Sequence, residues 1–187
     1  MGNNNLHKAD GIADIQIRDP FWDARRETVR ENAIPYQWDA LNDNVPGAEP
    51  SGCLRNFRIA AGLEPGEHRG YVFQDSDAAK WLEGAAYSLM SRPDPGLEAK
   101  ADAMVETIIA AQQPDGYLNT YYTITAPEKR FTNLRDNHEL YCLGHLIEAA
   151  AAYYRATGKT ALLNAVEKYV GLVDSVFGLE PDRKSVV

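Results

Sequence analysis

The residue types best suited to chemistry cluster at His138, Glu139 and Cys142, where an apolar segment begins. The spacing of apolar residues after this cluster predicts a helix from Asn137 to about Thr157. Backbone N–H groups and the helix dipole at such a start favour hydrogen-bond acceptors, including hydroxyl oxygens. A histidine there can bond a hydroxyl through one ring nitrogen while the protein holds the other. His138 is therefore the first candidate for binding a sugar-like ligand.

An aromatic loop precedes this cluster and carries further groups that suit a carbohydrate. It contains Asp115 and Tyr117, and Tyr121 and Tyr122 follow shortly afterwards. Aromatic rings pack well against the C–H face of a sugar, so these tyrosines are candidates for an aromatic wall. The alternative is that they only anchor a long loop, residues 114–136, and both interpretations stay open.

A second polar segment, which includes Gln74, carries two acids. Asp75 and Asp77 resemble the paired carboxylates of glycoside hydrolysis. Helix capping explains Asp75 equally well, because a helix is predicted to begin at Asp75 or Ser76. Neither carboxyl has a visible reason for a raised pKa, so the general-acid interpretation is the weaker one.

Metal binding within this chain is not predicted. His138 and Cys142 are four residues apart and could hold one edge of a metal site, but two ligands do not make one. Cys53 is far from Cys142 in sequence and forms no ligand-spaced pair with it. His145 lies two helical turns beyond His138, which is too far to share a metal, and is expected to hydrogen-bond in the core.

The composition argues against several classes of protein. A net charge of −8 and a pI near 5.0, without a basic run, argue against a nucleic-acid binder. No apolar stretch is long enough to span a membrane, and the N-terminus does not resemble a secretory signal. With only two cysteines, a cytoplasmic location is expected.

Helical periodicity accounts for most of the chain. Shorter helices are expected over residues 23–32, 36–42 and 53–61, with a break or kink at Pro35. Two helical hairpins follow, over residues 75–91 with 97–112, and 137–157 with 160–177. The buried stripes expected for the second hairpin are Leu140, Gly144, Ile147, Ala151 and Tyr154, then Leu163, Val166, Val170 and Val173.

The two hairpins begin about sixty residues apart, which is longer than the period of simple helical repeats. In each hairpin the first helix is rich in small and aromatic residues and the second in aliphatic residues. This pattern is typical of two concentric layers of helices, one inner and one outer. The sequence therefore predicts an all-α fold that is part of an (α/α)6 barrel, with a short N-terminal β-strand at Ile15–Ile17. The expected divisions are a tail and strand over 1–18, the barrel portion over 19–178 and a tail over 179–187.

Several segments together resemble glycoside hydrolase family 127, the β-L-arabinofuranosidase family. The similarity extends over nearly the whole chain, from about residue 15 to 178. The segments that carry it are Phe21-Trp22 and residues 34–38, 72–77, 80–83, 111–118, 138–141, 144–145 and 148–150.

The resemblance implies a function. It implies an (α/α)6 catalytic barrel followed by β-sandwich domains, to one of which the strand within 1–18 would belong, and it marks 179–187 as a truncated tail. It also implies retaining hydrolysis of an L-arabinofuranoside-type carbohydrate by a cysteine nucleophile. A zinc ion held by one glutamate and three cysteines would tune that thiolate, and another glutamate would act as acid/base. These groups are expected outside this chain, which by itself is then expected to bind no zinc and to be inactive. By the same resemblance His138 contacts the sugar, and Gln74, Asp75, Asp115 and Tyr117 lie near the pocket.

Two alternatives remain open. The chain could belong to another α/α-barrel carbohydrate enzyme, such as an unsaturated uronyl hydrolase or a sugar epimerase. It could instead be a non-enzymatic helical module that binds a partner through the apolar face that an incomplete barrel exposes.

Overall fold

The computed structural model describes residues 17–178, and all its elements are helices. The all-helical prediction is confirmed for this range. The strand expected at Ile15–Ile17 lies outside the described residues apart from Ile17, whose backbone is irregular, and so does the tail over 179–187. The helices are α1 (Pro20–Thr28), the π-helix η2 (Val29–Ala33), α2 (Ile34–Leu41), α3 (Cys53–Ala60), α4 (Asp75–Ser91), α5 (Pro95–Ala110), α6 (Thr120–Thr125), the 3-10 helix η3 (Pro127–Lys129), α7 (Leu134–Asn137), α8 (Glu139–Thr157) and α9 (Ala161–Val176).

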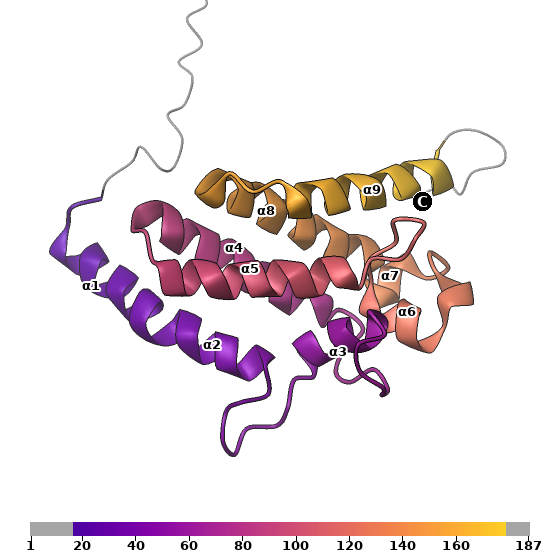
Figure 1. Cartoon of the computed structure of the whole chain (residues 1–187), viewed down its shortest axis with the longest axis horizontal. Helices are drawn as coiled ribbons and strands as arrows, with labels where there is room; N and C mark the ends of the chain where they lie inside the picture. Colours follow the sequence, from indigo (N-terminus) through magenta and orange to yellow (C-terminus); the bar gives the residue numbers. More distant parts are fainter. Residues whose placement is uncertain (1–16, 179–187) are drawn as a thin grey trace, which may run out of the picture.

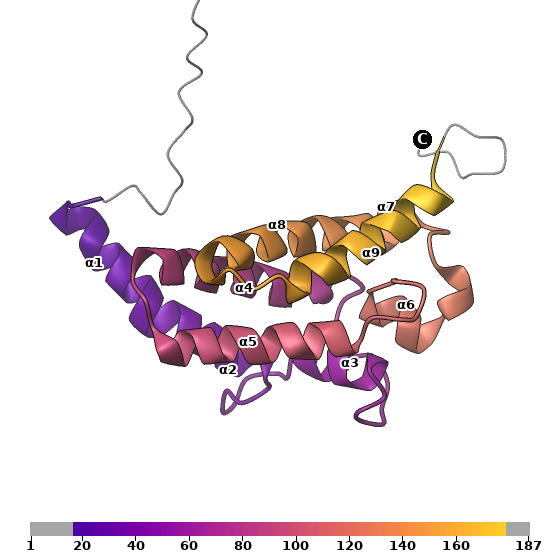
Figure 2. The ribbon, with the colours of Figure 1, turned by 45° about the horizontal axis from the view of Figure 1, so that its top comes forward.

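Two antiparallel hairpins, α4–α5 and α8–α9, form two layers. The first helices of the hairpins, α4 and α8, lie side by side and run in the same direction, and α5 and α9 pack on them (Figures 1 and 2). Local sequence sets the hairpin ends. The Asp94 carboxylate accepts the N–H groups of Gly96 and Leu97 at 3.0 Å, and Gly158 ends α8 with φ of 74°. Because α4 and α8 are parallel neighbours, their N-terminal ends meet at one end of the molecule.

The core lies between these layers. Fully buried alanines on both helices, including Ala85 and Ala86 of α4 and Ala149 and Ala150 of α8, allow the helices to approach closely. The apolar residues of α4 share one buried face, formed by Trp81, Leu82, Ala85, Ala86 and Leu89.

The buried face expected for α8 is largely wrong, whereas that for α9 is largely right, since Leu163 and Val173 pack against the core. On α8, Ile147 and Tyr154 are 41% and 44% exposed, whereas Leu143, Leu146, Ala150 and Tyr153 are buried. On α9, Val170 is 42% exposed and its neighbour Tyr169 is fully buried, although Val166 is buried as expected. Both helices are apolar on more than one face, so periodicity alone does not choose the face that packs.

A long helical segment at the N-terminus braces α4. The chain continues from α1 through the π-helix into α2, which begins just before Pro35, so no break occurs there. Arg30, in the π-helix, is buried and donates to the carbonyl oxygens of Ser88 at 2.8 Å and Arg92 at 3.1 Å, at the end of α4. The Trp81 indole N–H donates to the Ile34 carbonyl at 3.0 Å.

The long loop expected over residues 114–136 contains short helices instead. The Asn119 side chain accepts the N–H of Tyr122 at 3.1 Å and so caps α6, and the Asn133 side chain accepts the N–H of Asp136 at 3.1 Å and caps α7. None of the helices in the described part of the chain is long and apolar enough to cross a membrane.

Candidate functional site

The candidate site lies where α4 and α8 begin, with α6 and α7 close by (Figure 1). His138 stands between α7 and α8 with a left-handed backbone, φ 54° and ψ 30°. The helix α8 therefore begins at Glu139, two residues after the predicted Asn137. This geometry places His138 at the N-terminal end of α8, as the sequence indicates. His138 does not lie within the first turn of the helix, however, because the backbone makes a sharp corner at this residue.

A row of rings runs across the starts of the two helices, and we call it the aromatic row. Tyr71 and Phe73 stack with centroids 5.2 Å apart and planes at 1°. Phe73 meets the edge of His138 at 5.4 Å, and His138 meets Tyr141 at 5.6 Å. Tyr141 then meets His145 at 4.6 Å. Tyr71 and Tyr141 are the exposed members, at 69% and 44%, so part of the row faces outward and can receive a ligand.

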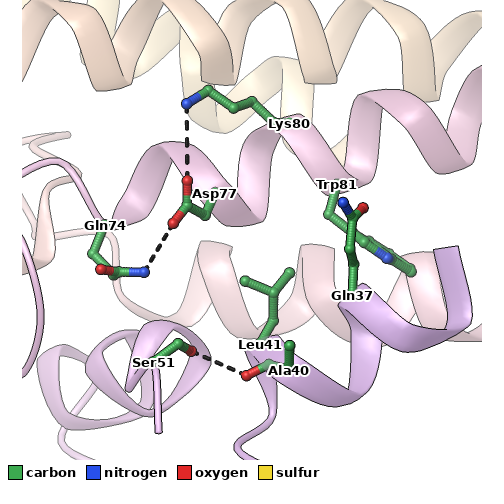
Figure 3. Close-up of a pocket in the computed structure, with 8 residues that line it drawn as sticks. All are labelled: Gln37, Ala40, Leu41, Ser51, Gln74, Asp77, Lys80 and Trp81. Carbon is green, nitrogen blue, oxygen red and sulfur yellow. Dashed lines mark hydrogen bonds and ion pairs between the residues drawn. The ribbon is translucent and has the colours of Figure 1, made fainter. Parts of the chain in front are cut away.

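A pocket of about 460 Å³ lies between α2 and α4 (Figure 3). The Gln74 amide donates to Asp77 at 2.9 Å, and Lys80 lies 3.8 Å from the same carboxylate. The Lys80 ammonium also lies 5.2 Å from the Tyr141 ring centroid, which links the pocket to the aromatic row. The lining residues are Gln37, Ala40, Leu41, Ser51, Gln74, Asp77, Lys80 and Trp81.

The charged groups in this pocket are perturbed by their surroundings. Burial raises the pKa of Asp77, although Lys80 partly opposes it. Burial alone would lower the pKa of Lys80, but the Tyr141 phenol and the Asp77 carboxylate together raise it. Lys80 therefore stays a cation beside a carboxylate, two amides and an indole. Such a mixture of hydrogen-bonding groups and ring faces suits a polyhydroxylated ligand.

Asp75 does not face this pocket, and it forms no acid pair with Asp77. Its carboxylate is buried and accepts the N–H of Thr120 at 2.7 Å and the hydroxyl of Thr120 at 2.5 Å. Burial raises its pKa to about 6, against the effect of these two hydrogen bonds. Residues two apart on a helix point in different directions, which separates Asp75 from Asp77. Asp75 joins α4 to α6, and the capping role expected for it is also absent, because no side chain caps α4.

Tyr117 does not contribute an exposed wall. Its side chain is fully buried, its hydroxyl donates to Glu139 at 2.5 Å, and Arg130 lies 4.0 Å from its ring centroid. A side chain with no exposed surface cannot contact a sugar, and additional protein around it would only increase the burial. Asp115 serves the same local structure, since it accepts the Tyr117 N–H at 3.1 Å and pairs with Arg130 at 2.9 Å.

The other two tyrosines of the expected wall differ from each other. Tyr122 is buried and its hydroxyl accepts a 2.6 Å hydrogen bond from the Asn137 amide, whereas Tyr121 is partly exposed and meets the edge of His68. The ring that lines the pocket is instead Trp81, and the exposed rings of the aromatic row are Tyr71 and Tyr141. The sequence does hold a signal for Tyr141, which follows His138 by three residues, about one turn into the helix that begins at Glu139.

The two cysteines do not fit a zinc site. Cys53 is buried in contact with the Gln74 carbonyl, and burial raises the pKa of both Cys53 and Cys142. Buried thiols of this kind stay protonated, whereas zinc binds thiolate. Among residues 17–178, no group of three His, Cys, Asp or Glu side chains could hold a metal ion.

His145 is not the core hydrogen-bonding residue that the sequence suggested. Its imidazole is partly exposed, and Nδ1 lies 3.2 Å from Glu148 Oε2 without hydrogen-bond geometry. Its main contact is the Tyr141 ring.

Comparison with known proteins identifies the family. The model of the β-L-arabinofuranosidase GH127 catalytic domain matches residues 14–186. The chain is 42% identical to the non-reducing end β-L-arabinofuranosidase of Bifidobacterium longum subsp. longum, over 90% of the chain and 28% of that relative. The crystal structure of a GH127 β-L-arabinofuranosidase from Geobacillus stearothermophilus T6 matches with a TM-score of 0.89 and 57% identity, covering 91% of this chain and 27% of that one. A second GH127 β-arabinofuranosidase structure matches with a TM-score of 0.83 and 33% identity, over 94% and 28%.

The paired helical hairpins define an all-α domain, and these matches define its family. The chain belongs to the GH127 β-L-arabinofuranosidase family and corresponds to part of its catalytic domain. It spans just over a quarter of the length of the relatives that it matches.

Proposed function

We propose that this chain supplies part of the sugar-binding wall of a β-L-arabinofuranosidase, and that His138 contacts the sugar. One observation carries this proposal: Lys80, which lines the pocket, lies 5.2 Å from the Tyr141 ring of the aromatic row, and the family match covers both. In the pocket, Gln74, Asp77 and Lys80 offer donors and acceptors for hydroxyl groups. The aromatic row offers ring faces for the apolar side of the sugar.

The proposed architecture is an (α/α)6 barrel in which α4 and α8 are inner helices and α5 and α9 outer ones. The parallel, side-by-side arrangement of α4 and α8 supports it, since inner helices of such a barrel are parallel neighbours (Figure 2). The exposed apolar residues Ile147, Tyr154 and Val170 also suit contact with further helices. In this proposal the strand expected near residue 15 belongs to a β-sandwich domain.

The proposed chemistry is retaining hydrolysis with a cysteine nucleophile and zinc. Because Cys53 and Cys142 are buried neutral thiols, the zinc ligands and the nucleophile would come from residues other than the described ones. When bound, the metal would hold the nucleophilic sulfur as a thiolate. The role left to the described residues is to bind and orient the sugar.

The two alternative functions are not favoured, because the matched relatives are arabinofuranosidases. A uronyl hydrolase or epimerase would need its catalytic His or Asp residues among those described here, and Asp75 is sequestered by Thr120. A cytoplasmic location stays a prediction from the two unpaired cysteines.

A substitution at His138 in the complete enzyme tests this proposal. His138→Ala should lower kcat/KM for a nitrophenyl β-L-arabinofuranoside about tenfold or more, the equivalent of one good hydrogen bond to the sugar. His68→Ala is the matched control, because it removes an imidazole in a similar edge contact, with Tyr121, outside the aromatic row. If His138→Ala and His68→Ala have equal, small effects, His138 does not contact the sugar.

The isolated 187-residue chain tests the proposal that the nucleophile and the zinc ligands lie elsewhere. We expect the purified chain to show no turnover of the same substrate and no stoichiometric zinc, while the complete enzyme shows both. Turnover by the isolated chain would overturn the proposal that the nucleophile and the metal lie elsewhere.

A further inference from the structure

Two non-glycine residues near the start of α8 have left-handed backbones, and one carboxylate connects them. These residues are Phe131, with φ of 57°, and His138, with φ of 54°. Side chains with a Cβ rarely adopt this conformation, so the surrounding structure must hold each one in place. Glu139 follows His138 directly, and its carboxylate accepts the Phe131 N–H at 2.9 and 3.0 Å.

Glu139 is fixed from both sides. Its side chain has no exposed surface, and Oε1 also accepts the hydroxyl of Tyr117 at 2.5 Å. A carboxylate that accepts two donors in a buried setting is held firmly, because the loss of either hydrogen bond removes a donor that water cannot replace there. The residue on the C-terminal side of His138 is therefore anchored to two loop segments at once.

The residue on the N-terminal side of His138 is anchored as well. The Asn137 amide donates to the Tyr122 hydroxyl at 2.6 Å, and the Tyr122 ring is 2% exposed. Tyr122 lies on α6, and the first residue of α6, Thr120, is bound by the Asp75 carboxylate of α4. A chain of contacts thus runs from the start of α4 to the residue preceding His138.

The His138 ring itself has weaker restraints. It touches Phe73 and Tyr141 through ring edges, and its nitrogens make no hydrogen bond to another described residue. Edge contacts of this kind limit the position of a ring, but they define its rotation about the Cβ–Cγ bond less well. The direction of the imidazole nitrogens therefore depends on the backbone corner that carries the ring.

We infer that Glu139 and Asn137 are positioning residues, which hold the backbone corner at His138 so that its imidazole points at the sugar. This inference rests on the proposed sugar contact of His138. Glu139 acts only through its neighbour, because its carboxylate is buried and occupied by protein donors, and a general acid must reach the reacting oxygen.

A double-mutant cycle in the complete enzyme tests this inference. Glu139→Gln keeps the shape of the side chain but replaces one of the two oxygens that accept the Phe131 N–H by an NH2 group, which cannot accept it. If Glu139 acts through His138, Glu139→Gln should lower kcat/KM about tenfold in the wild-type background and less than about twofold in a His138→Ala background. A merely structural role predicts the same fold loss in both backgrounds.

The outcomes separate this inference from the proposed function. Loss of kcat/KM in His138→Ala, with an equal further loss on adding Glu139→Gln, keeps the sugar contact and overturns the positioning role. An unchanged kcat/KM in His138→Ala overturns both, because no sugar contact is then left to position. Non-additive losses support both.

A second arm uses tyrosines, in case Glu139→Gln fails to fold. Tyr122→Phe removes the hydroxyl that Asn137 reaches, and Tyr153→Phe is the matched control. Tyr153 is also 2% exposed, and its hydroxyl bonds to Asp102 away from the corner. We expect both variants to lower Tm, but only Tyr122→Phe to lower kcat/KM, by about fivefold. Equal effects of the two on kcat/KM would overturn the inference.

Rescue by a conservative change completes this arm. In Asn137→Asp the new carboxylate can accept a hydrogen bond from the Tyr122 hydroxyl, so the contact survives with its direction reversed. Asn137→Leu has a similar volume but cannot make the contact. We expect Asn137→Asp to keep kcat/KM within about twofold of wild type and Asn137→Leu to lose about fivefold. Equal losses in both variants would contradict a role for this hydrogen bond.

Discussion

The phenol of Tyr117 donates a 2.5 Å hydrogen bond to the carboxylate of Glu139, and neither side chain has any exposed surface. The bond joins the loop after α5 to the first residue of α8. Burial, the Tyr169 phenol and the Glu139 carboxylate raise the pKa of Tyr117, so the phenol keeps the proton that it donates. A tyrosine that the sequence suggests for sugar binding is thus part of the support for the site.

Removing the Tyr117 hydroxyl tests this structural role. Tyr117→Phe should lower the free energy of unfolding by about 1–3 kcal/mol, because the buried Glu139 loses one of its donors. Thermal unfolding of the complete enzyme measures the change. Tyr36→Phe, at a side chain 59% exposed, should leave Tm unchanged. An unchanged Tm together with a raised KM in Tyr117→Phe would restore the sugar-contact interpretation.

Arg30 should contribute strongly to stability, because its guanidinium donates to the last carbonyl groups of α4 from a buried position. Arg30→Met keeps much of the side-chain length but removes both donors, and the Ser88 carbonyl then keeps only the Arg92 N–H. We expect a loss of about 2–4 kcal/mol, observed as a lower midpoint in denaturant. Arg25→Met is the control, since Arg25 is exposed and donates only to its own helix. Similar midpoints for both variants would contradict the bracing role.

Gly116 permits a close approach between the loop after α5 and α9. Its φ is +91°, and a Cβ there would lie 2.8 Å from the backbone oxygen of Lys168. Gly116→Ala should therefore cost more than about 2 kcal/mol, from clash and backbone strain together. Gly158→Ala separates the two causes, because Gly158 has φ of +74° with nothing near its Cβ position, and should cost about 1 kcal/mol. Equal Tm losses would show that the contact with Lys168 is unimportant.

Asp75 should make stability depend on pH in an unusual direction. Burial raises its pKa to about 6 in the folded state, above the ordinary value of 3.8. The folded state therefore binds more protons between these values, so this residue's contribution to stability falls as pH rises from about 4 to about 6 and is constant above. The difference in Tm between wild type and Asp75→Asn, measured against pH, isolates the effect. A difference that grows over this window would mean that the Thr120 hydrogen bonds outweigh burial.

Much of the helical structure could be predicted from the sequence, because its signals are local. The helix α4 runs over the residues expected, and α5 begins at the Asp94-Pro95 pair that the predicted turn contains. Asn119 and Asn133, which cap α6 and α7, are local signals as well. They were missed because the composition of residues 114–136 predicts a loop. The boundaries that were missed are those with weak apolar periodicity.

The roles of individual polar residues were harder to predict. Asp75 and Tyr117 have the residue types of a sugar site, yet each is bound to a partner elsewhere in the chain, Thr120 and Glu139 respectively. Sequence spacing does not reveal such partners, because they lie tens of residues away. Sequence spacing also does not reveal the contact between Lys80 and Tyr141, which forms because α4 and α8 pack side by side.

The sequence by itself determined the helical content, the hairpin ends and, through several short segments, the family. These depend on neighbouring residues: apolar spacing, capping side chains and turn-forming glycines act within one or two helical turns. Only the tertiary structure decided which face of α8 is buried and which rings meet His138. Phe73 reaches His138 because α4 and α8 start at the same end of the molecule, and that contact depends on packing between helices that are distant in the chain.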